Sequence, residues 1–413
     1  MLRTILLAYA FYYPLTMAWL WIFGALNYYV RRELRAPNRT NPPKLPAWPK
    51  ATLVVPCHNE GENIRDTIEY LAAQDYPDFE IIAVNDGSRD NTGAILDELT
   101  GEYPQLRVIH FASNQGKAMG LRMAALAANS DYLICIDGDA LLDPYATRWM
   151  VWHLVSGPRV GAVTGNPRIR NRSSLLGRLQ VGEFSSIIGL IKRAQRTAGR
   201  VFTVSGVIAG FNRTALHQIG YWNTDMVTED IDVSWRLQMD YWDVRYEPNA
   251  LCWILMPETI RGLWKQRLRW AQGGAEVALR YFKLLLRWRA RRMWPLILEY
   301  LMSVVWSYDM LWIMVFGVAG LAIPVPAWLH VPGPVPTWFG AILGTTCIMQ
   351  FLFSILVDRR YEGRIGRQFV WIIWYPLVYW VIGMLTTVVA VPKAIFKRRG
   401  TRAIWESPDR GIR

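Results

Sequence analysis

Residues 132–139 read YLICIDGD, an uninterrupted apolar run that ends in two aspartates separated by one glycine. Similar apolar runs occur at 52–56, 80–84, 107–110 and 161–164, and the stretches between them carry apolar residues at helical spacing. Strands rich in Ile and Val without polar alternation are buried on both faces, because helices cover both sides of their sheet. This part of the sequence therefore predicts an α/β domain, doubly wound around a mostly parallel sheet.

Acidic residues stand at the ends of two of these runs. Asp86 follows the run at 80–84, and Asp137 and Asp139 follow the run at 132–136. In doubly wound sheets the ligand binds beyond the carboxyl ends of the strands. Two carboxylates on one turn are hard ligands that suit Mg²⁺ or Mn²⁺, whose other positions take phosphate oxygens and water. A D-x-D pattern alone is common in solvated turns, but its position after a buried strand favours a metal–diphosphate site.

Two further motifs lie toward the carboxyl end. Residues 228–230 read T-E-D before an apolar helical pattern, where acids would also interact favourably with the helix dipole. Residues 266–270 read QRLRW, a Q-x-x-R-W pattern within the segment 261–292. That segment carries ten Lys and Arg residues, one acid and several leucines, which predicts an amphipathic helix on a membrane surface. On that interpretation alone, Arg269 and Trp270 bind only lipid.

The composition indicates that part of the chain lies in lipid. Of the 413 residues, 52% are hydrophobic, 19% are charged and 21 are Trp, which excludes a disordered chain and an ordinary soluble enzyme. The four cysteines show no C-x-x-C spacing, so we expect reduced, buried thiols. The net charge of +13 is concentrated at 261–292 and 393–413, beside hydrophobic stretches. Such positions suit the cytoplasmic membrane surface, so we expect no nucleic-acid partner.

Hydrophobic stretches flank the α/β region on both sides. Residues 5–30 carry no charge over a length that crosses a bilayer, and Arg31 and Arg32 follow directly, which excludes a cleaved signal peptide. These arginines predict an amino terminus outside and a cytoplasmic α/β domain. Three further spans are expected at 294–323, 338–357 and 369–391. This count leaves the basic tail outside, against its charge, so either the stretch around Pro376 is re-entrant or the tail violates the rule.

The expected organisation is a large cytoplasmic domain inserted between membrane helices. Its parts are a span at 1–30, the α/β domain at 31–260, the amphipathic segment at 261–293, about three spans at 294–397 and a basic tail at 398–413. Asp309 would lie near the middle of the second span, where an acid faces other helices or water. It either lines a polar conduit or is buried against a hydroxyl or backbone group, and the sequence leaves both open.

Taken jointly, the motifs resemble those of processive family 2 glycosyltransferases with the GT-A fold, the group of cellulose, chitin and hyaluronan synthases. Longer stretches resemble the bacterial poly-β-1,6-N-acetylglucosamine synthases within it. These stretches are AVNDGSRDNT (83–92), NQGKA (114–118), CIDGDALLD (135–143), VGAVTGNPRIR (160–170), GEFSSIIGLIKR (182–193), WILMPET (253–259), LWKQRLRWAQGGAEV (263–277) and SPDRG (407–411). The sequence departs from this family at its amino terminus, where it has one span and the family has two.

The resemblance implies an inverting, processive transferase of the bacterial inner membrane that polymerises N-acetylglucosamine from UDP-GlcNAc, with Mg²⁺ or Mn²⁺, onto a growing biofilm polysaccharide. It assigns the general base to Asp230, with Glu229 and Arg269 as further catalytic residues, and the metal to Asp139 and Asp137. The substrate-binding residues that it implies are Pro56, Asn59, Glu60, Asp86, Lys117, Asp137, Gln266 and Trp270. It also implies a small two-span membrane subunit and regulation by cyclic-di-GMP.

The expected chemistry needs groups of these types. Inversion in one displacement requires a base for the acceptor hydroxyl, and positive charge is required where the diphosphate leaves. Three alternative functions remain at this stage. They are a chitin- or hyaluronan-like synthase, a non-processive lipid glycosyltransferase, and a membrane scaffold that has lost catalysis.

Overall fold

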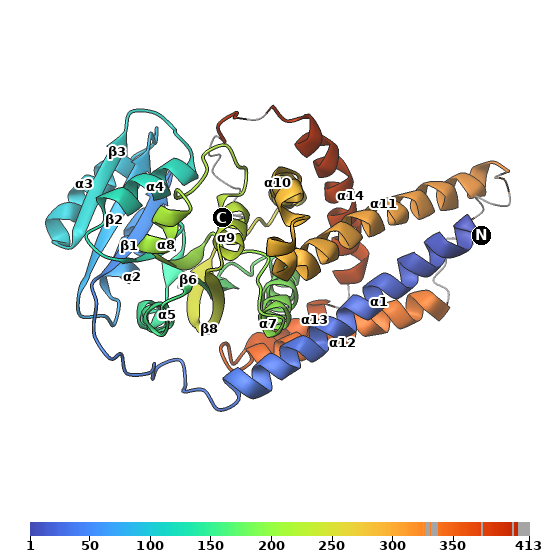
Figure 1. The fold of residues 1–413 in the computed structure, drawn as a ribbon, viewed down its shortest axis with the longest axis horizontal. Helices are drawn as coiled ribbons and strands as arrows, with labels where there is room; N and C mark the ends of the chain where they lie inside the picture. Colours follow the sequence, from blue (N-terminus) through green and yellow to red (C-terminus); the bar gives the residue numbers. More distant parts are fainter. Residues whose placement is uncertain (325, 327–330, 332–337, 373–374, 399, 404–413) are drawn as a thin grey trace.

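The computed structural model describes the chain except residues 325, 327–330, 332–337, 373–374, 399 and 404–413. The SPDRG stretch and most of the basic tail at 398–413 therefore lie outside the described residues. Figure 1 shows an α/β domain at one end of the molecule and a group of long helices that projects from it.

In the described part of the chain, an eight-stranded sheet forms the centre of the α/β domain. In spatial order its strands are β3 (Leu106–Phe111), β2 (Phe79–Asp86), β1 (Ala51–Cys57), β4 (Tyr132–Ile136), β7 (Ile208–Asn212), β6 (Val160–Ile169), β8 (Asp243–Ile254) and β5 (Leu141–Leu142). Neighbours from β3 to β4 pair in parallel, as do β6 and β8. The α/β class is confirmed, and all five apolar runs form strands.

The sheet is mixed, however, where a mostly parallel one was expected. The difference comes from β7, which pairs antiparallel with both β4 and β6, and from β5, which pairs antiparallel with β8. Strand β7 reads IAGFN, and Gly210 interrupts its apolar pattern, so it was not identified as a strand from the sequence. Its position beside β4 brings the chain that precedes it close to the D-x-D turn.

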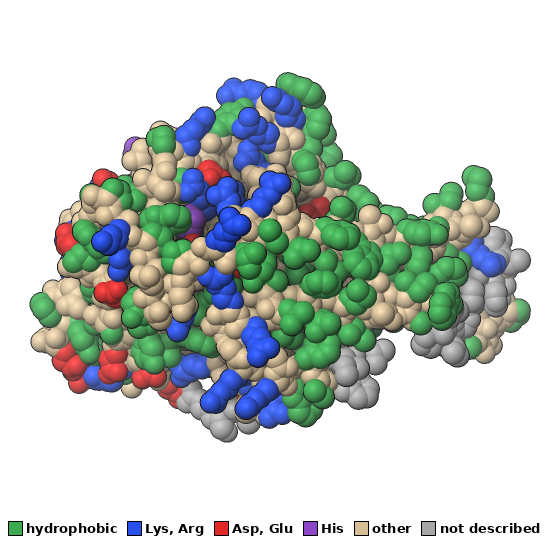
Figure 2. All heavy atoms as spheres, turned by 90° about the horizontal axis from the view of Figure 1, so that it is seen from below, with side chains coloured by type: hydrophobic (Ala, Val, Ile, Leu, Met, Phe, Trp, Pro, Cys, Tyr) green, Lys and Arg blue, Asp and Glu red, His purple; other side chains and the backbone are tan. Residues whose placement is uncertain are grey.

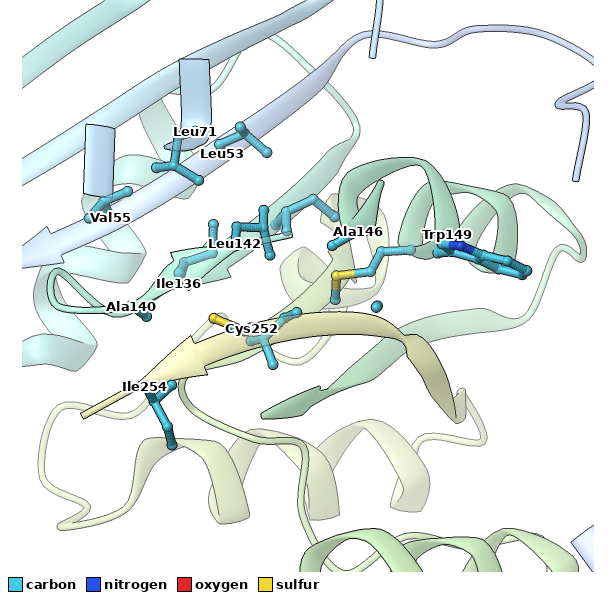
Figure 3. Close-up of a cluster of buried hydrophobic side chains, with 14 of the residues drawn as sticks. Leu53, Val55, Leu71, Ile136, Ala140, Leu142, Ala146, Trp149, Cys252 and Ile254 are labelled. Atoms are coloured by element: carbon cyan, nitrogen blue, oxygen red, sulfur yellow. The ribbon is translucent and has the colours of Figure 1, made fainter. Parts of the chain in front are cut away.

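Helices cover both faces of this sheet. They are α2 (Ile64–Ala72), α3 (Thr92–Glu102), α4 (Lys117–Ala127), α5 (Ala146–Val155), α8 (Arg213–Gln218) and α9 (Glu229–Met239). Figure 3 shows the core between β1, α2, β4, β5, α5 and β8. Ile136 and Ala140, which flank the D-x-D turn, are both buried in this core. Because both neighbours are packed, the two aspartates between them are held on a rigid support.

Three helices among the described residues are long and apolar enough to cross a membrane. These segments are Arg3–Glu33, Trp288–Ala322 and Trp338–Asp358. They contain α1 (Leu2–Tyr28) with the π-helical turn η1 (Tyr29–Glu33), the 3₁₀ turn η3 (Trp288–Met293) with α11 (Trp294–Ala322), and α12 (Trp338–Asp358). Figure 1 shows α1, α11 and α12 running side by side away from the sheet. We call these helices, together with α14, the bundle.

The fourth expected span, at 369–391, is described except for residues 373–374. It contains α13 (Phe369–Ile372) and α14 (Tyr375–Phe396), preceded by the turn η4 (Ile365–Gln368). In Figure 1, α14 is steeply inclined to the other three helices and packs along α10 (Ile260–Leu285).

The chain that follows α14 returns to the α/β domain. The Lys397 ammonium donates to the carbonyl of Asp225 at 2.9 Å and to Glu276 Oε2 at 2.9 Å. The backbone N–H of Ala403 donates to the carbonyl of Thr224 at 3.0 Å. The described start of the basic tail is thus held against the α/β domain and its neighbouring helix α10.

A buried charge network joins the bundle to the α/β domain. It involves α6 (Leu175–Glu183), the π-helical turn η2 (Phe184–Leu190) and α7 (Ile191–Thr197), which follow β6. The Arg193 guanidinium on α7 donates to Glu33 at 2.7 and 3.1 Å and lies 2.9 Å from Asp358. Arg168 of β6 donates to Asp358 at 2.8 Å. All four side chains are buried, so the ends of α1 and α12 are held to the sheet through paired charges.

Surface charge changes abruptly along the molecule. Figure 2 shows Lys and Arg side chains gathered where the α/β domain meets the projecting helices, whose own surface is almost entirely apolar. A basic band beside an apolar surface is typical of a membrane boundary. All four cysteines lie in the described part and are buried and unbridged, as expected.

Candidate active site

A cavity of about 610 Å³ lies at the carboxyl end of β4 and continues between the helices of the bundle. Its lining contains most of the residues predicted for the site, namely Lys117, Asp137, Asp139, Glu229, Asp230, Gln266, Arg269 and Trp270. The D-x-D, T-E-D and Q-x-x-R-W motifs are far apart in the sequence, and the fold brings them to one cavity. Asp139 and Asp230 therefore face a shared space.

The D-x-D turn is crowded and buried. Asp139 is 8% exposed, and burial, together with the neighbouring Asp137, raises its pKa to about 7. A Cβ on Gly138 would lie 3.0 Å from the Glu60 side chain and 3.3 Å from the Pro56 carbonyl, so a side chain there would require both neighbours to move slightly. The buried Asp139 carboxylate and the partly buried Asp137 carboxylate lie on one turn, and such a pair suits a divalent cation. The described residues contain no group of three such ligands, so other oxygens would have to complete the coordination.

Lys117 links the D-x-D and T-E-D motifs. It begins α4, and its ammonium lies 2.5 Å from Asp137 Oδ1 and 3.3 Å from Glu229 Oε1. It also donates to the carbonyl of Gly206 at 3.0 Å. Burial alone would lower the pKa of Lys117, but the two carboxylates outweigh it and hold that pKa above its ordinary value. Lys117 therefore stays protonated and offsets part of the negative charge of the site.

Asp230 lies in the first turn of α9, as the sequence predicted. The backbone N–H of Ile231 donates to Asp230 Oδ1 at 2.9 Å. Burial, and then the adjacent Glu229 carboxylate, raise the pKa of Asp230 to about 6, while Lys117 acts in the opposite direction. A carboxylate with a pKa just below neutral is ionised at pH 7 and yet a stronger base than an ordinary aspartate.

The Q-x-x-R-W motif lies on α10 and faces the cavity, with a buried support behind it. Gln266, Arg269 and Trp270 all line the cavity, so Arg269 and Trp270 do more than contact lipid. The intervening Arg267 is buried, forms an ion pair with Glu183 at 2.7 Å and stacks on the Trp270 ring at 4.2 Å from its centroid. Sequence reasoning did not single out this arginine, because the pattern leaves its position open.

The T-E-D turn and α10 meet at Gly273. A Cβ at this position would lie 2.0 Å from Thr228 Oγ1 and 2.3 Å from Thr228 Cγ2, so no side chain fits there. Gly274, the next residue, faces the Tyr300 ring, and its Cβ would meet that ring at 3.3 Å. Gly273 therefore has no room for a methyl group, whereas a methyl group on Gly274 would need only a small movement of the Tyr300 ring.

We expect Gly273→Ala to push α10 away from the T-E-D turn, with an overpacking cost of about 1–3 kcal/mol and a loss of about 10²-fold in kcat. Gly274→Ala is the control and should keep kcat within about threefold, since alanine favours a helix. Steady-state kinetics of the two variants, with thermal unfolding in parallel, tests this. Equal kcat values for both would contradict the packing argument.

Four predicted residues do not line the cavity. Asp86 ends β2 and accepts the backbone N–H groups of Gln115 at 2.6 Å and Gly116 at 2.8 Å. Burial raises the pKa of Asp86, and these hydrogen bonds oppose that rise. Pro56, Asn59 and Glu60 belong to β1 and the loop after it, which touches the D-x-D turn at Gly138. This group lies beside the cavity because β1 and β4 are neighbours in the sheet.

One buried residue of the cavity was missed. Lys192 lines the cavity and is 5% exposed, and its ammonium donates to Ser205 Oγ at 2.6 Å and to Thr164 Oγ1 at 3.1 Å. A lysine that follows an apolar stretch usually indicates that a helix ends there in solvent. Only the tertiary packing of α7 reveals that it points inward.

Asp309 does not line the cavity, although Ser307 does. Two positions along a helix differ by about 200° around its axis, so the two side chains point to nearly opposite faces. Asp309 is buried, and neither of its oxygens has a hydrogen-bond partner among the described residues. Neither of the two alternatives left open by the sequence is therefore found.

Acids at the carboxyl ends of sheet strands face one cavity that extends between apolar helices, and the comparisons with known proteins identify the class of this site as a glycosyltransferase of the GT-A fold. The sequence model described as glycosyltransferase-like family 2 matches residues 49–273. The fold is similar to that of a mannosyltransferase of Pyrobaculum calidifontis, solved with GDP-mannose and Mn²⁺. That similarity has a TM-score of 0.66 at 20% identity and covers 95% of this chain and 98% of the other.

Full-length relatives extend the similarity beyond the catalytic domain. The chain is 39% identical to the poly-β-1,6-N-acetyl-D-glucosamine synthase of Staphylococcus epidermidis over 402 residues, 97% of each protein. It is 38% identical to the synthase of the same name from Staphylococcus aureus over 401 residues, again 97% of each. The chain belongs to glycosyltransferase family 2.

Proposed function

We propose that this chain is a processive, inverting β-glycosyltransferase that polymerises N-acetylglucosamine from UDP-GlcNAc into poly-β-1,6-N-acetylglucosamine. The sugar and the linkage are supported by the similarity to the staphylococcal synthases, which covers 97% of both chains. The observation that carries the proposal is the single cavity that contains the three motifs and continues into the bundle.

The donor is proposed to bind across Gly138, where the two halves of the site touch. Asp86 and the loop from Pro56 to Glu60 would face the uridine, and Asp137 and Asp139 would hold Mg²⁺ or Mn²⁺. The donor set fits this group, because a divalent cation takes one or two protein carboxylates and completes its shell with phosphate and water. When bound, the cation supplies positive charge to the leaving diphosphate.

The transfer itself is proposed to use Asp230 as general base. The Asp230 carboxylate takes the proton of the acceptor hydroxyl as that oxygen attacks the anomeric carbon and UDP departs from the opposite face. Glu229 lies beside it and shares Lys117 with Asp137, which keeps this group of charges together. Arg269 would stabilise the leaving diphosphate, and Gln266 and Trp270 would hold the acceptor sugar.

The product is proposed to leave through the bundle. The cavity lining includes Trp21 of α1, Glu299 of α11, Gln350 of α12 and Thr387 of α14. Glu299 accepts a hydrogen bond from Trp21 at 3.2 Å and so presents a polar edge within an apolar wall. A polymer that grows at Asp230 would therefore have an exit among membrane helices. Accumulation of polymer outside inverted membrane vesicles, on the catalytic-domain side, would contradict this direction.

The membrane, the partners and the regulation follow from the same proposal. Three apolar helices are compatible with membrane insertion, and we propose the bacterial inner membrane with the catalytic domain in the cytoplasm. A small two-span subunit and cyclic-di-GMP are proposed as partner and regulator. Activity measured after purification with and without such a subunit, each in the presence and absence of cyclic-di-GMP, tests both.

Removing the metal is expected to abolish synthesis. Reconstituted protein supplied with labelled UDP-GlcNAc and Mg²⁺ should form a polymer that a β-1,6-glucosaminidase degrades. EDTA should reduce synthesis to background, and Mg²⁺ or Mn²⁺ in excess should restore it. Asp139→Asn should weaken UDP binding in the presence of Mg²⁺ but not in its absence. Synthesis that persists in EDTA would contradict the proposed metal site.

The same assay separates the alternatives. Dependence on UDP-glucuronate would indicate a hyaluronan-like synthase, and a β-1,4 linkage would indicate a chitin-like one. Transfer of a single sugar to lipid would indicate a non-processive enzyme. UDP release that survives Asp230→Asn would favour a chain without this catalytic chemistry.

A further inference from the structure

Lys192 occupies an unusual position for a charged side chain. It is buried in the cavity wall, and both hydroxyls that it contacts belong to other elements, Thr164 to β6 and Ser205 to the loop before β7. Among the described residues, no carboxylate lies within ion-pair distance of its ammonium. Burying an unpaired charge costs free energy, so an apolar side chain would fill this space at lower cost if packing were its only role.

The segment that Lys192 contacts is a meeting point of the catalytic elements. The backbone N–H of Ser205 donates to Thr164 Oγ1 at 2.8 Å, and that of Val204 donates to Ser234 Oγ at 2.8 Å. Ser234 in turn donates to the carbonyl of Asp230 at 2.6 Å. Residues 204–206 are thus tied to β6 on one side and to the helix that bears the proposed base on the other.

The same segment also holds the donor side of the site. Lys117, which pairs with Asp137, donates to the carbonyl of Gly206. A Cβ on Gly206 would lie 3.2 Å from Asp230 Oδ2 and 3.4 Å from Lys117 Nζ, so the backbone at this position borders both side chains. A small shift of residues 204–206 would therefore move Lys117 and Asp230 relative to each other.

We propose that Lys192 is a positioning residue of the transfer reaction, which holds residues 204–206 through Ser205 and thereby fixes the distance between Lys117 and Asp230. The inference rests on the proposed role of Asp230. Besides these two hydroxyl contacts, Lys192 lines the cavity that contains Asp230. Burial lowers the pKa of Lys192 to about 7, and the charge of Asp230 opposes that shift, so the two groups lie within electrostatic reach.

A double-mutant cycle tests the inference. Lys192→Met and Ser205→Ala each remove the same contact from opposite ends. Each is expected to lower kcat by about 10–10²-fold, with KM for UDP-GlcNAc changed less than about threefold. The double variant should be no slower than the slower single variant, because the contact can be lost only once. Lys192→Gln, which retains a donor, should recover part of kcat.

The controls separate this inference from the alternatives. Lys283→Met, at an exposed position on α10, should keep wild-type kinetics. Thermal unfolding of every variant identifies any that fails to fold, and Lys192→Gln then serves as the variant for comparison. Wild-type kcat in Lys192→Met, or effects of the two single variants that multiply in the double variant, would overturn the inference. Absence of sugar transfer by the wild-type protein would instead overturn the proposed function.

Discussion

Asp230→Asn is expected to lower kcat for sugar transfer by about 10²–10⁴-fold, or about 3–5 kcal/mol of transition-state stabilisation, with little change in UDP affinity. Asparagine preserves the size of the side chain and can still accept the hydrogen bond from the Ile231 N–H, but it cannot take up the proton of the acceptor hydroxyl. The Asp230 carboxylate faces the same cavity as the D-x-D aspartates, so its loss should act on chemistry more than on donor binding.

The pH dependence of the wild-type enzyme provides a second measurement of the same group. Burial and Glu229 raise the pKa of Asp230 to about 6, and the base accepts a proton only when it is ionised. We therefore expect kcat/KM to fall about tenfold per pH unit below about pH 6 and to be insensitive to pH above about 7 on this account. Saturating Mg²⁺ keeps the D-x-D carboxylates ionised during the measurement. The remaining activity of Asp230→Asn should not show this decrease in kcat/KM at low pH.

A control on the same helix makes the test specific. Asp240 is exposed at the end of α9, and Asp240→Asn changes the charge of the helix without reaching the cavity. It should keep wild-type kcat. An Asp230→Asn enzyme that retains more than a tenth of wild-type kcat would rule out Asp230 as the general base.

Arg193→Met is expected to cause the largest loss of stability, about 3–5 kcal/mol, because it leaves Glu33 and Asp358 buried with fewer partners. The Arg193 guanidinium is fully buried and pairs with both carboxylates, which come from the ends of two membrane helices. We expect a decrease of about 10 °C in the Tm of the detergent-solubilised protein. Because the network joins the bundle to β6, polymer synthesis should fall even at temperatures where the α/β domain remains folded.

Arg122→Met provides the comparison for this variant. Arg122 is exposed on α4, so its replacement removes a positive charge without disturbing a buried pair. Its Tm should stay within about 2 °C of wild type. A similarly small change for Arg193→Met would mean that the buried network contributes little to the attachment of the bundle.

The fold class was predictable because its signals are local. Buried parallel strands appear as short apolar runs, and ligands of doubly wound sheets bind beyond the carboxyl ends of the strands, so Asp137 and Asp139 after one run and Asp86 after another together predicted a site. The antiparallel strand β7 was not predicted, because Gly210 interrupts its apolar run and nothing in the local sequence indicates antiparallel pairing. Its pairing with β4 and β6 depends on contacts between segments far apart in the chain.

The sequence by itself supplied the residue types proposed for the candidate site, since the types and spacing of the acids, the lysine and the Q-x-x-R-W residues are local properties. Only the tertiary structure decided which buried charges support them. Three buried contacts illustrate this. They join Arg267 to Trp270, Lys192 to Ser205, and Arg193 to Asp358. No periodic pattern in the sequence indicates them, because they depend on which side chains the folded chain packs together. In a bilayer-adjacent domain such pairs form only where packing excludes water, and packing is a property of the whole fold.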